Sequence, residues 1–180
     1  MSDEEMFTEL YRQNYAAVEA YVSKRTAPSS APDVVADVFL TAWRRFTDIP
    51  DEKELPWLYG VARRMLANDR RSQRRQISLG ELLAAQPPAL SNERQPDDVI
   101  VELDLARAFD GLGDADQEIL RLVLWEKLPI KDCALVLGCG TAAARVRLFR
   151  ARKRLGRLLP QISSARVLSD EGRPRKESHA

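Results

Sequence analysis

Apolar residues recur at three- and four-residue spacing in both halves of this chain, and the recurrence stops between residues 76 and 96. Such spacing is the pattern of amphipathic helices, which bury one stripe of side chains and expose the opposite face. The interruption contains Pro87, Pro88 and Pro96 among serine, asparagine and glutamine residues, and prolines placed in this way break helices. We therefore predict an all-α protein with two small helical domains joined by a flexible linker.

The domain boundaries follow from the same pattern. We predict a first domain at residues 1–75, a linker at 76–96, a second domain at 97–160 and a flexible tail at 161–180. The first domain is expected to hold three to four helices, and the second to end in a long helix. Pro160 is expected to stop that helix, because proline lacks a backbone N–H and its ring clashes with the preceding turn.

The second domain contains a short apolar helix, a turn with two glycines and an arginine-rich helix in succession. The turn at 138–140 reads Gly-Cys-Gly, and we expect Thr141 to cap the helix that follows it. Upstream, Asp114 and Gln117 have the spacing of a capping box at the start of an earlier helix. This succession is typical of a helix-turn-helix, whose second helix lies in the DNA major groove. Two core helices joined by a tight turn are the alternative interpretation of this segment alone.

The charges are sorted along the chain, although the chain as a whole has a net charge of only +1. Residues 63–75 hold six arginines and one acidic residue, and residues 145–157 hold seven basic residues and no acidic one. Between them, residues 97–118 hold eight acidic residues and one arginine. Phosphate groups of a nucleic acid relieve the repulsion within such basic clusters by releasing counterions. Alternatively, the basic clusters form ion pairs with the acidic segment, or they are simply solvated on the surface.

The composition gives no support to an enzyme. The single histidine is His179, next to the last residue, and the two cysteines are Cys133 and Cys139. A catalytic triad needs an imidazole inside the fold, and a zinc site of the usual kind needs more cysteine or histidine residues than this chain has. No glycine-rich phosphate loop is present. We therefore expect no catalysis, no metal and no cofactor. No apolar run approaches the roughly 20 residues of a membrane span and the N-terminus is acidic, so we expect a cytoplasmic protein with no membrane insertion.

Motifs in both halves resemble one family, the bacterial sigma factors of the extracytoplasmic-function (ECF) class. The first half, which is similar to sigma domain two, reads Phe7-x-x-Leu10-Tyr11, then Asp33-Val-Val-Ala-Asp37-Val-Phe39-Leu-x-Ala-Trp43, then Pro56-Trp57-Leu58-Tyr59-x-Val61-Ala62-Arg63. The second half, which is similar to sigma domain four, carries Arg145-x-Arg147-Leu148-x-Arg150-Ala151-Arg152 in the position of the recognition helix. The order and separation of the two sets make the resemblance specific.

The resemblance implies a dissociable subunit that directs RNA polymerase to promoters. The implied partners are core RNA polymerase, through the clamp helices of its largest subunit and its flap, promoter DNA, and an anti-sigma factor. The clamp helices would meet a polar stripe on the second helix, made of Asp33, Asp37, Leu40 and Arg44.

The resemblance also implies two DNA-binding surfaces. Contacts to the −10 element fall on Trp57, Tyr59, Arg63, Arg64, Arg70, Arg71, Arg74 and Arg75. Contacts to the −35 element fall on Thr141, Arg145, Val146, Arg147, Phe149 and Arg150. Three positions depart from the usual family residues: Arg64 replaces an asparagine, and Gly140 and Val146 each replace a serine.

Two other functions compete with this interpretation. An autonomous helix-turn-helix regulator would bind duplex DNA unaided, usually as a dimer on paired half-sites. A carboxylate-based hydrolase using Asp33 and Asp37 is a distant third, because no base or nucleophile accompanies these two acids.

Overall fold

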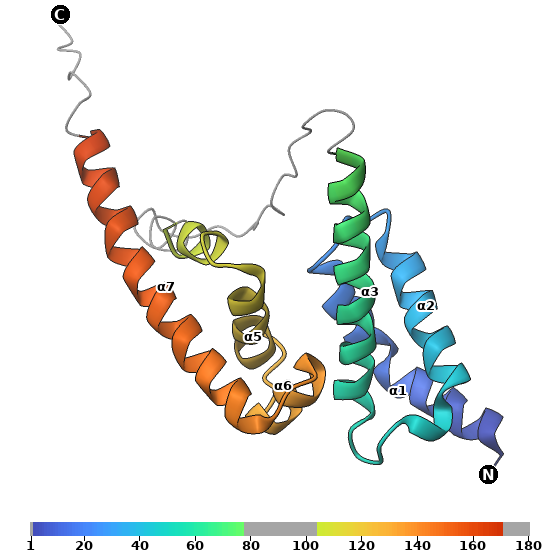
Figure 1. The fold of residues 1–180 in the computed structure, drawn as a ribbon. Coiled ribbons are helices and arrows are strands. Elements are labelled where there is room, and N and C mark those ends of the chain that lie inside the picture. Colours follow the sequence, from blue (N-terminus) through green and yellow to red (C-terminus); the bar gives the residue numbers. More distant parts are fainter. Residues whose placement is uncertain (1, 78–103, 171–180) are drawn as a thin grey trace, which may run out of the picture. The chain divides into compact units, whose positions relative to one another are not determined.

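The computed structural model describes residues 2–77 and 104–170, and the regular structure within them is entirely helical (Figure 1). This confirms the predicted all-α fold. None of the helices in these two ranges combines the length and the apolar character that crossing a membrane requires. The helices are α1 (Asp3–Ser23), α2 (Ala31–Arg44), the 3-10 turn η1 (Phe46–Asp48), α3 (Glu54–Ile77), α5 (Asp114–Leu124), α6 (Ile130–Leu137) and α7 (Thr141–Asp170), with a further helical stretch at 104–110.

The described residues form two compact units. One unit combines residues 2–77 with 126–144, and the other combines residues 104–125 with 145–170. The first unit therefore includes α6, which the sequence assigned to the second domain. Most of the predicted linker lies outside the described residues, but its first two residues, 76 and 77, end α3.

In the first unit, α1, α2 and α3 pack against one another and α6 packs against α3. The start of α1 is fixed by a capping box, in which Glu5 N donates to Ser2 Oγ over 3.3 Å and Ser2 N donates to Glu5 Oε2 over 2.8 Å. The side of α2 opposite the polar stripe is buried at Val35, Phe39 and Ala42. The core has no exposed surface at Val18, Tyr21, Val22, Val38, Leu58 and Ala62.

Aromatic pairs join α1 to its neighbours in this core. The Phe39 ring on α2 lies 4.6 Å from the Tyr11 ring, and the Tyr59 ring on α3 is stacked 4.3 Å from the Tyr21 ring. Such pairs add a specific geometry to the burial of apolar area, by about 0.5–1.5 kcal/mol each. They fix how α2 and α3 are rotated about their axes, and so determine which side chains face outward.

In the second unit, Gln117 does not act as the predicted capping-box partner. Helix α5 begins at Asp114 after Gly113, and no side chain caps it. Gln117 Nε2 instead donates to the carbonyl oxygens of Phe109 and Leu112, each over 3.1 Å. The capping prediction was wrong because the Gln117 side chain reaches back across the turn to carbonyl groups at the end of the helix at 104–110 and just after it.

Helix α7 is longer than the sequence predicted. It runs through Pro160 to Asp170, so residues 161–170 are helical and do not belong to a flexible tail. A proline inside a helix removes one hydrogen bond and costs about 3 kcal/mol, but the helix can resume beyond it. The residues after Pro160 include Gln161, Ala165 and Arg166, which are good helix formers. Residues 171–180 lie outside the described part of the chain.

The turn between α6 and α7 has the geometry that the sequence predicted for a helix-turn-helix. Gly138 ends α6 in the left-handed region, at φ 64° and ψ 38°. Its amide donates to Leu135 O over 3.1 Å, and the amide of Cys139 donates to Ala134 O over 3.0 Å, which together form a Schellman motif. Helix α7 already includes Thr141, so Gly140, and not Thr141 as predicted, stands at the position before its first turn.

Gly138→Ala is expected to lower the free energy of unfolding by about 1–2 kcal/mol, because an L side chain is strained at this φ. The measurement is chemical denaturation followed by circular dichroism. Gly156→Ala is the matched control, since Gly156 lies inside α7 with open space around its Cβ position. Alanine there should raise stability by up to about 1 kcal/mol, so equal effects of the two substitutions would contradict the assignment.

Candidate functional site

The outer face of α2 carries all four residues predicted to meet the polymerase. Asp33, Asp37, Leu40 and Arg44 are exposed, while the opposite side of the helix is buried. Leu40 is 45% exposed and Trp43, three residues further along, is 47% exposed. We call the set Asp33, Asp37, Leu40, Trp43 and Arg44 the α2 surface.

The sequence pattern did not single out Trp43 as a surface residue. One edge of its ring packs on Phe7 of α1, with ring centroids 5.0 Å apart, and the rest of the side chain remains exposed. The three-residue spacing from Leu40 was the signal that could have placed it on the outer face. A half-exposed tryptophan bordered by charges is typical of a protein-binding surface.

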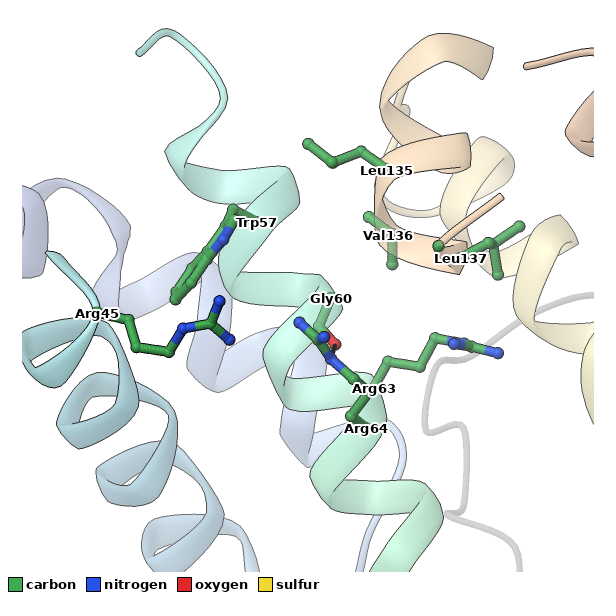
Figure 2. A pocket seen from close by; sticks show the side chains of 9 residues that line it. Arg45, Trp57, Gly60, Arg63, Arg64, Leu135, Val136 and Leu137 are labelled. Carbon is green, nitrogen blue, oxygen red and sulfur yellow. Dashed lines mark hydrogen bonds between the residues drawn. The ribbon is translucent and has the colours of Figure 1, made fainter. Parts of the chain in front are cut away.

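A basic pocket lies beside α3 in the first unit, and its volume is about 290 Å³ (Figure 2). It brings together three predicted DNA-binding residues, Trp57, Arg63 and Arg64, with Arg45, which the sequence analysis missed. Figure 2 shows Arg45 beside Trp57 on one side of the pocket, with the side chains of α6 across from them. The α6 side of the lining consists of residues 135–138.

The side chains of this pocket are held by local contacts. Arg45 Nε donates to Asp48 Oδ2 over 2.8 Å, and its guanidinium lies 5.8 Å from the centroid of the Trp57 ring. Arg64 Nε donates to Gly60 O over 3.0 Å, one helical turn back along α3. Three guanidinium groups around one hollow favour an anionic group such as phosphate, which arginine binds well.

Tyr59 lies in the core and not on a DNA-binding surface. Its side chain is 3% exposed, and its hydroxyl donates to Ala17 O over 3.4 Å. Burial, with a smaller contribution from the negative charge of Glu126, raises the pKa of Tyr59 to about 12. The prediction for Tyr59 was wrong because Tyr59 is turned about 200° around the helix from Trp57 and therefore faces α1.

The remaining residues predicted to contact the −10 element lie further along the same helix. Arg70, Arg71, Arg74 and Arg75 belong to α3, which extends to Ile77. Their side chains lie outside the described part of the structure, so their contacts remain a prediction.

The predicted −35 residues divide into exposed and half-buried side chains on α7. Arg145, Val146, Phe149 and Arg150 are exposed, and Thr141 and Arg147 are half-buried. Phe149 is 67% exposed, which is unusual for a large apolar side chain without a partner. Ala144 and Ala151 are fully buried on the other side of the helix.

Most of the basic groups on α7 are not neutralised within the described residues. Arg154 pairs with Asp116, a buried acid of α5. No acidic residue of the described ranges forms an ion pair with Arg145 or Arg150. Pairing between the acidic segment and the second basic cluster therefore occurs, but it leaves the exposed part of α7 available for phosphate.

Comparisons with known proteins match both halves of the chain. The family model described as Sigma-70 region 2 matches residues 10–76, and the model described as Sigma-70 region 4 matches residues 102–155. The ECF RNA polymerase sigma factor BldN of Streptomyces coelicolor is 31% identical over 86% of this chain, which spans 60% of BldN. The ECF RNA polymerase sigma factor SigL of Mycobacterium tuberculosis is 27% identical over 87% of this chain and 90% of its own length.

Solved structures share the fold. The sigma factor RpoE of Bartonella quintana, solved in complex with the anti-sigma factor NepR, is 23% identical with a TM-score of 0.64. The alignment covers 87% of this chain and 98% of that one. CnrH, solved in complex with the cytosolic domain of CnrY, is 21% identical with a TM-score of 0.56, and the alignment covers 88% and 90% of the two chains.

The raised pKa of Tyr59 predicts a loss of stability at alkaline pH. Below pH 10 the hydroxyl is protonated in both the folded and the unfolded chain, whereas between pH 10 and about 12 only the unfolded chain releases its proton. The free energy of unfolding therefore falls as pH rises through this window. In urea denaturation at a series of pH values, Tyr59→Phe should lack this part of the fall, and parallel curves for the two proteins would refute the burial argument.

Proposed function

The chain belongs to the sigma-70 family, as an ECF sigma factor with regions 2 and 4, and from this we propose that it binds core RNA polymerase and directs it to promoters with −10 and −35 elements. The observation that carries the proposal is the match of both regions in order on one short chain. Each region has an outward surface of suitable chemistry, the α2 surface in the first unit and the basic face of α7 in the second. As an initiation factor it would have no catalytic step of its own and would work in the cytoplasm.

The α2 surface is the proposed contact with the clamp helices of the largest polymerase subunit. Its charged residues surround Leu40 and Trp43, so an apolar contact would be framed by ion pairs. The proposed second contact with the polymerase is with its flap, and it would be made by the unit that contains α5.

DNA contacts are proposed on two helices. On α3, Trp57, Arg63 and Arg64 would meet the −10 element, with the arginines at 70–75 holding phosphates. On α7, Arg145, Val146, Phe149 and Arg150 would meet the −35 element. An arginine there can bind guanine O6 and N7 with two hydrogen bonds, which discriminates between bases by about 1–3 kcal/mol.

An anti-sigma factor is the proposed regulatory partner. Two solved structures of this fold are complexes, one of the sigma factor RpoE with the anti-sigma factor NepR and one of CnrH with the cytosolic domain of CnrY. We propose that an anti-sigma factor binds this chain as well.

Reconstituted transcription tests the function directly. The purified chain is added to bacterial core RNA polymerase on genomic DNA fragments, and the 5′ ends of the transcripts are mapped. We expect specific start sites only when both proteins are present, with weak DNA binding by the chain alone. An autonomous regulator would instead bind duplex promoter DNA without polymerase, as a dimer on paired half-sites.

Asp37→Arg should weaken binding to core polymerase by about tenfold, because it reverses a charge at the centre of the α2 surface. Asp51→Arg is the matched control, since Asp51 is an exposed acid outside that surface. Fluorescence anisotropy of a labelled chain titrated with core polymerase measures both affinities. Equal affinities for the two variants would remove the assignment of this surface.

Arg150→Ala should reduce initiation at promoters that depend on the −35 element, by about tenfold or more if the contact is bidentate. Arg157→Ala serves as the control, because Arg157 is exposed on the same helix but lies beyond the matched region 4. Run-off transcription on promoters with intact and scrambled −35 sequences provides the comparison. A defect that persists when the −35 sequence is scrambled would place Arg150 elsewhere in the mechanism.

A further inference from the structure

We propose that the basic pocket beside α3 is a binding site for a free nucleoside diphosphate. The inference rests on the proposed function, since three lining residues, Trp57, Arg63 and Arg64, are also proposed to meet the −10 element. The pocket lies within the first unit, whose helices α3 and α6 pack against each other. A bound nucleotide would occupy side chains that DNA also needs, so the two ligands would compete.

The pocket has the charge of an anion-binding site. Its lining includes Arg45, Arg63 and Arg64, and none of the lining residues is acidic. Of the acidic side chains that the structure describes, Asp48 pairs with Arg45, and none pairs with Arg63 or Arg64. A nucleoside diphosphate carries about three negative charges at neutral pH, because its terminal phosphate loses a second proton near about pH 6. Three guanidinium groups, one partly offset by Asp48, therefore suit a diphosphate better than the single charge of one phosphodiester.

Two of the three guanidinium groups are held in place through their Nε atoms. Arg45 Nε donates to Asp48 Oδ2 over 2.8 Å, and Arg64 Nε donates to Gly60 O over 3.0 Å. These two contacts do not use the terminal Nη groups, which can bind the oxygens of a phosphate in pairs. Figure 2 shows the Arg45 side chain directed toward α3. Because these side chains are already ordered, less conformational entropy is lost when an anion binds.

The α6 side of the pocket offers an apolar surface to a nucleobase. Leu135 lines the pocket and is 40% exposed, although Val136 and Leu137 next to it are buried. Figure 2 shows Leu135 extending from α6 toward the side of the pocket where Trp57 lies. A planar base between Leu135 and the edge of Trp57 would cover apolar surface that is otherwise in contact with water. The pocket thus combines a charged place for phosphates with an apolar place for a base.

The size of the pocket favours a single nucleotide. Its volume of about 290 Å³ lies at the lower end of the range for small-molecule pockets, roughly 300–1,000 Å³. Residues 135–138 form one wall, and the α6 backbone comes so close to α3 that a Cβ atom placed on Gly60 would lie 3.7 Å from the Cα of Val136. A hollow of this size holds one nucleotide, whereas a DNA duplex could touch only its rim.

Equilibrium binding of ADP to the full chain tests the site. ADP supplies a diphosphate and a base, adenosine and inorganic pyrophosphate each supply one of these parts, and titration calorimetry measures all three. We expect one ADP per chain with a dissociation constant below about 1 mM, the upper end of ordinary substrate levels. Adenosine and pyrophosphate should each bind about tenfold more weakly. Absence of saturable ADP binding would overturn the proposal, and equally tight binding of pyrophosphate would overturn the place assigned to the base.

Two pairs of variants separate this pocket from general attraction between ADP and basic residues. Arg45→Gln should weaken ADP binding by about tenfold, because it removes a charged hydrogen-bond donor. Arg12→Gln, at an exposed arginine of α1, should leave it unchanged. Leu135→Glu puts a negative charge at the apolar wall and should weaken binding at least as much, whereas Leu124→Glu, at an exposed leucine of α5, should not. Variants that bind ADP as their controls do would overturn the site.

Photochemical labelling locates the base on the unaltered chain. The chain is irradiated with 8-azido-ADP, digested with trypsin and analysed by mass spectrometry. We expect adducts in the peptides 54–63 and 132–145, which contain Trp57 and Leu135, and suppression of these adducts by excess ADP. Adducts that ADP suppresses but that lie in other peptides would show that the nucleotide binds elsewhere and would overturn the proposal.

This proposal and the proposed function can fail separately, because ADP binding is measured without polymerase or DNA. A chain that directs transcription from specific start sites but binds no ADP keeps the proposed function and loses this site. A chain that binds ADP through Arg45 and Leu135 but directs no specific transcription keeps the site and loses the proposed function.

Discussion

The buried pairing of Arg25 with Glu126 is the interaction on which the arrangement of the first unit depends. A guanidinium and a carboxylate that are almost fully removed from water are stable only when each compensates the other. Their positions in the sequence are 101 residues apart, so the pair connects the end of α1 to the residues just before α6. The Tyr21 ring beneath the guanidinium and the Tyr59 ring stacked on it extend this contact into the core. A charge pair of this kind specifies one arrangement, because apolar packing alone tolerates small shifts of one helix over another.

Helix α3 shows how one element serves both stability and recognition. Leu58, Tyr59, Ala62 and Leu66 are buried, and they fix the rotation of the helix against α1 and α2. Once that rotation is fixed, the guanidinium groups of Arg63 and Arg64 are directed to the pocket. The candidate DNA-binding face is thus a consequence of core packing, and a substitution in the core would be expected to misalign it.

The sequence predicted the parts of the molecule that depend on local spacing. The polar stripe of α2 with its exposed positions Asp33 and Asp37, and the glycine turn before α7, both follow from helical periodicity and turn chemistry within one segment. Helical periodicity did not predict the features that depend on contacts with residues outside the segment. It also could not predict whether a helix continues past a proline, because a proline only destabilises a helix by a certain amount. It could not show that Tyr59 faces α1, that Arg45 joins the pocket, or that Gln117 bonds backwards across a turn. Pro160 was expected to end α7, but it only weakens a helix that continues to Asp170.

The ion pairs inside the fold determine which of the sorted charges remain free on the surface. Asp116 binds Arg154, Glu126 binds Arg25, and Asp132 binds Lys53, so several acids are used inside the fold. Basic groups such as Arg145 and Arg150 remain on the surface, although the net charge of the chain is only +1. A nearly neutral chain has little long-range attraction for DNA, because steering depends on the summed field. Its basic faces therefore act at contact distance, after something else has brought DNA to them. This fits the proposed function, in which the chain would reach promoter DNA as part of a complex with core RNA polymerase.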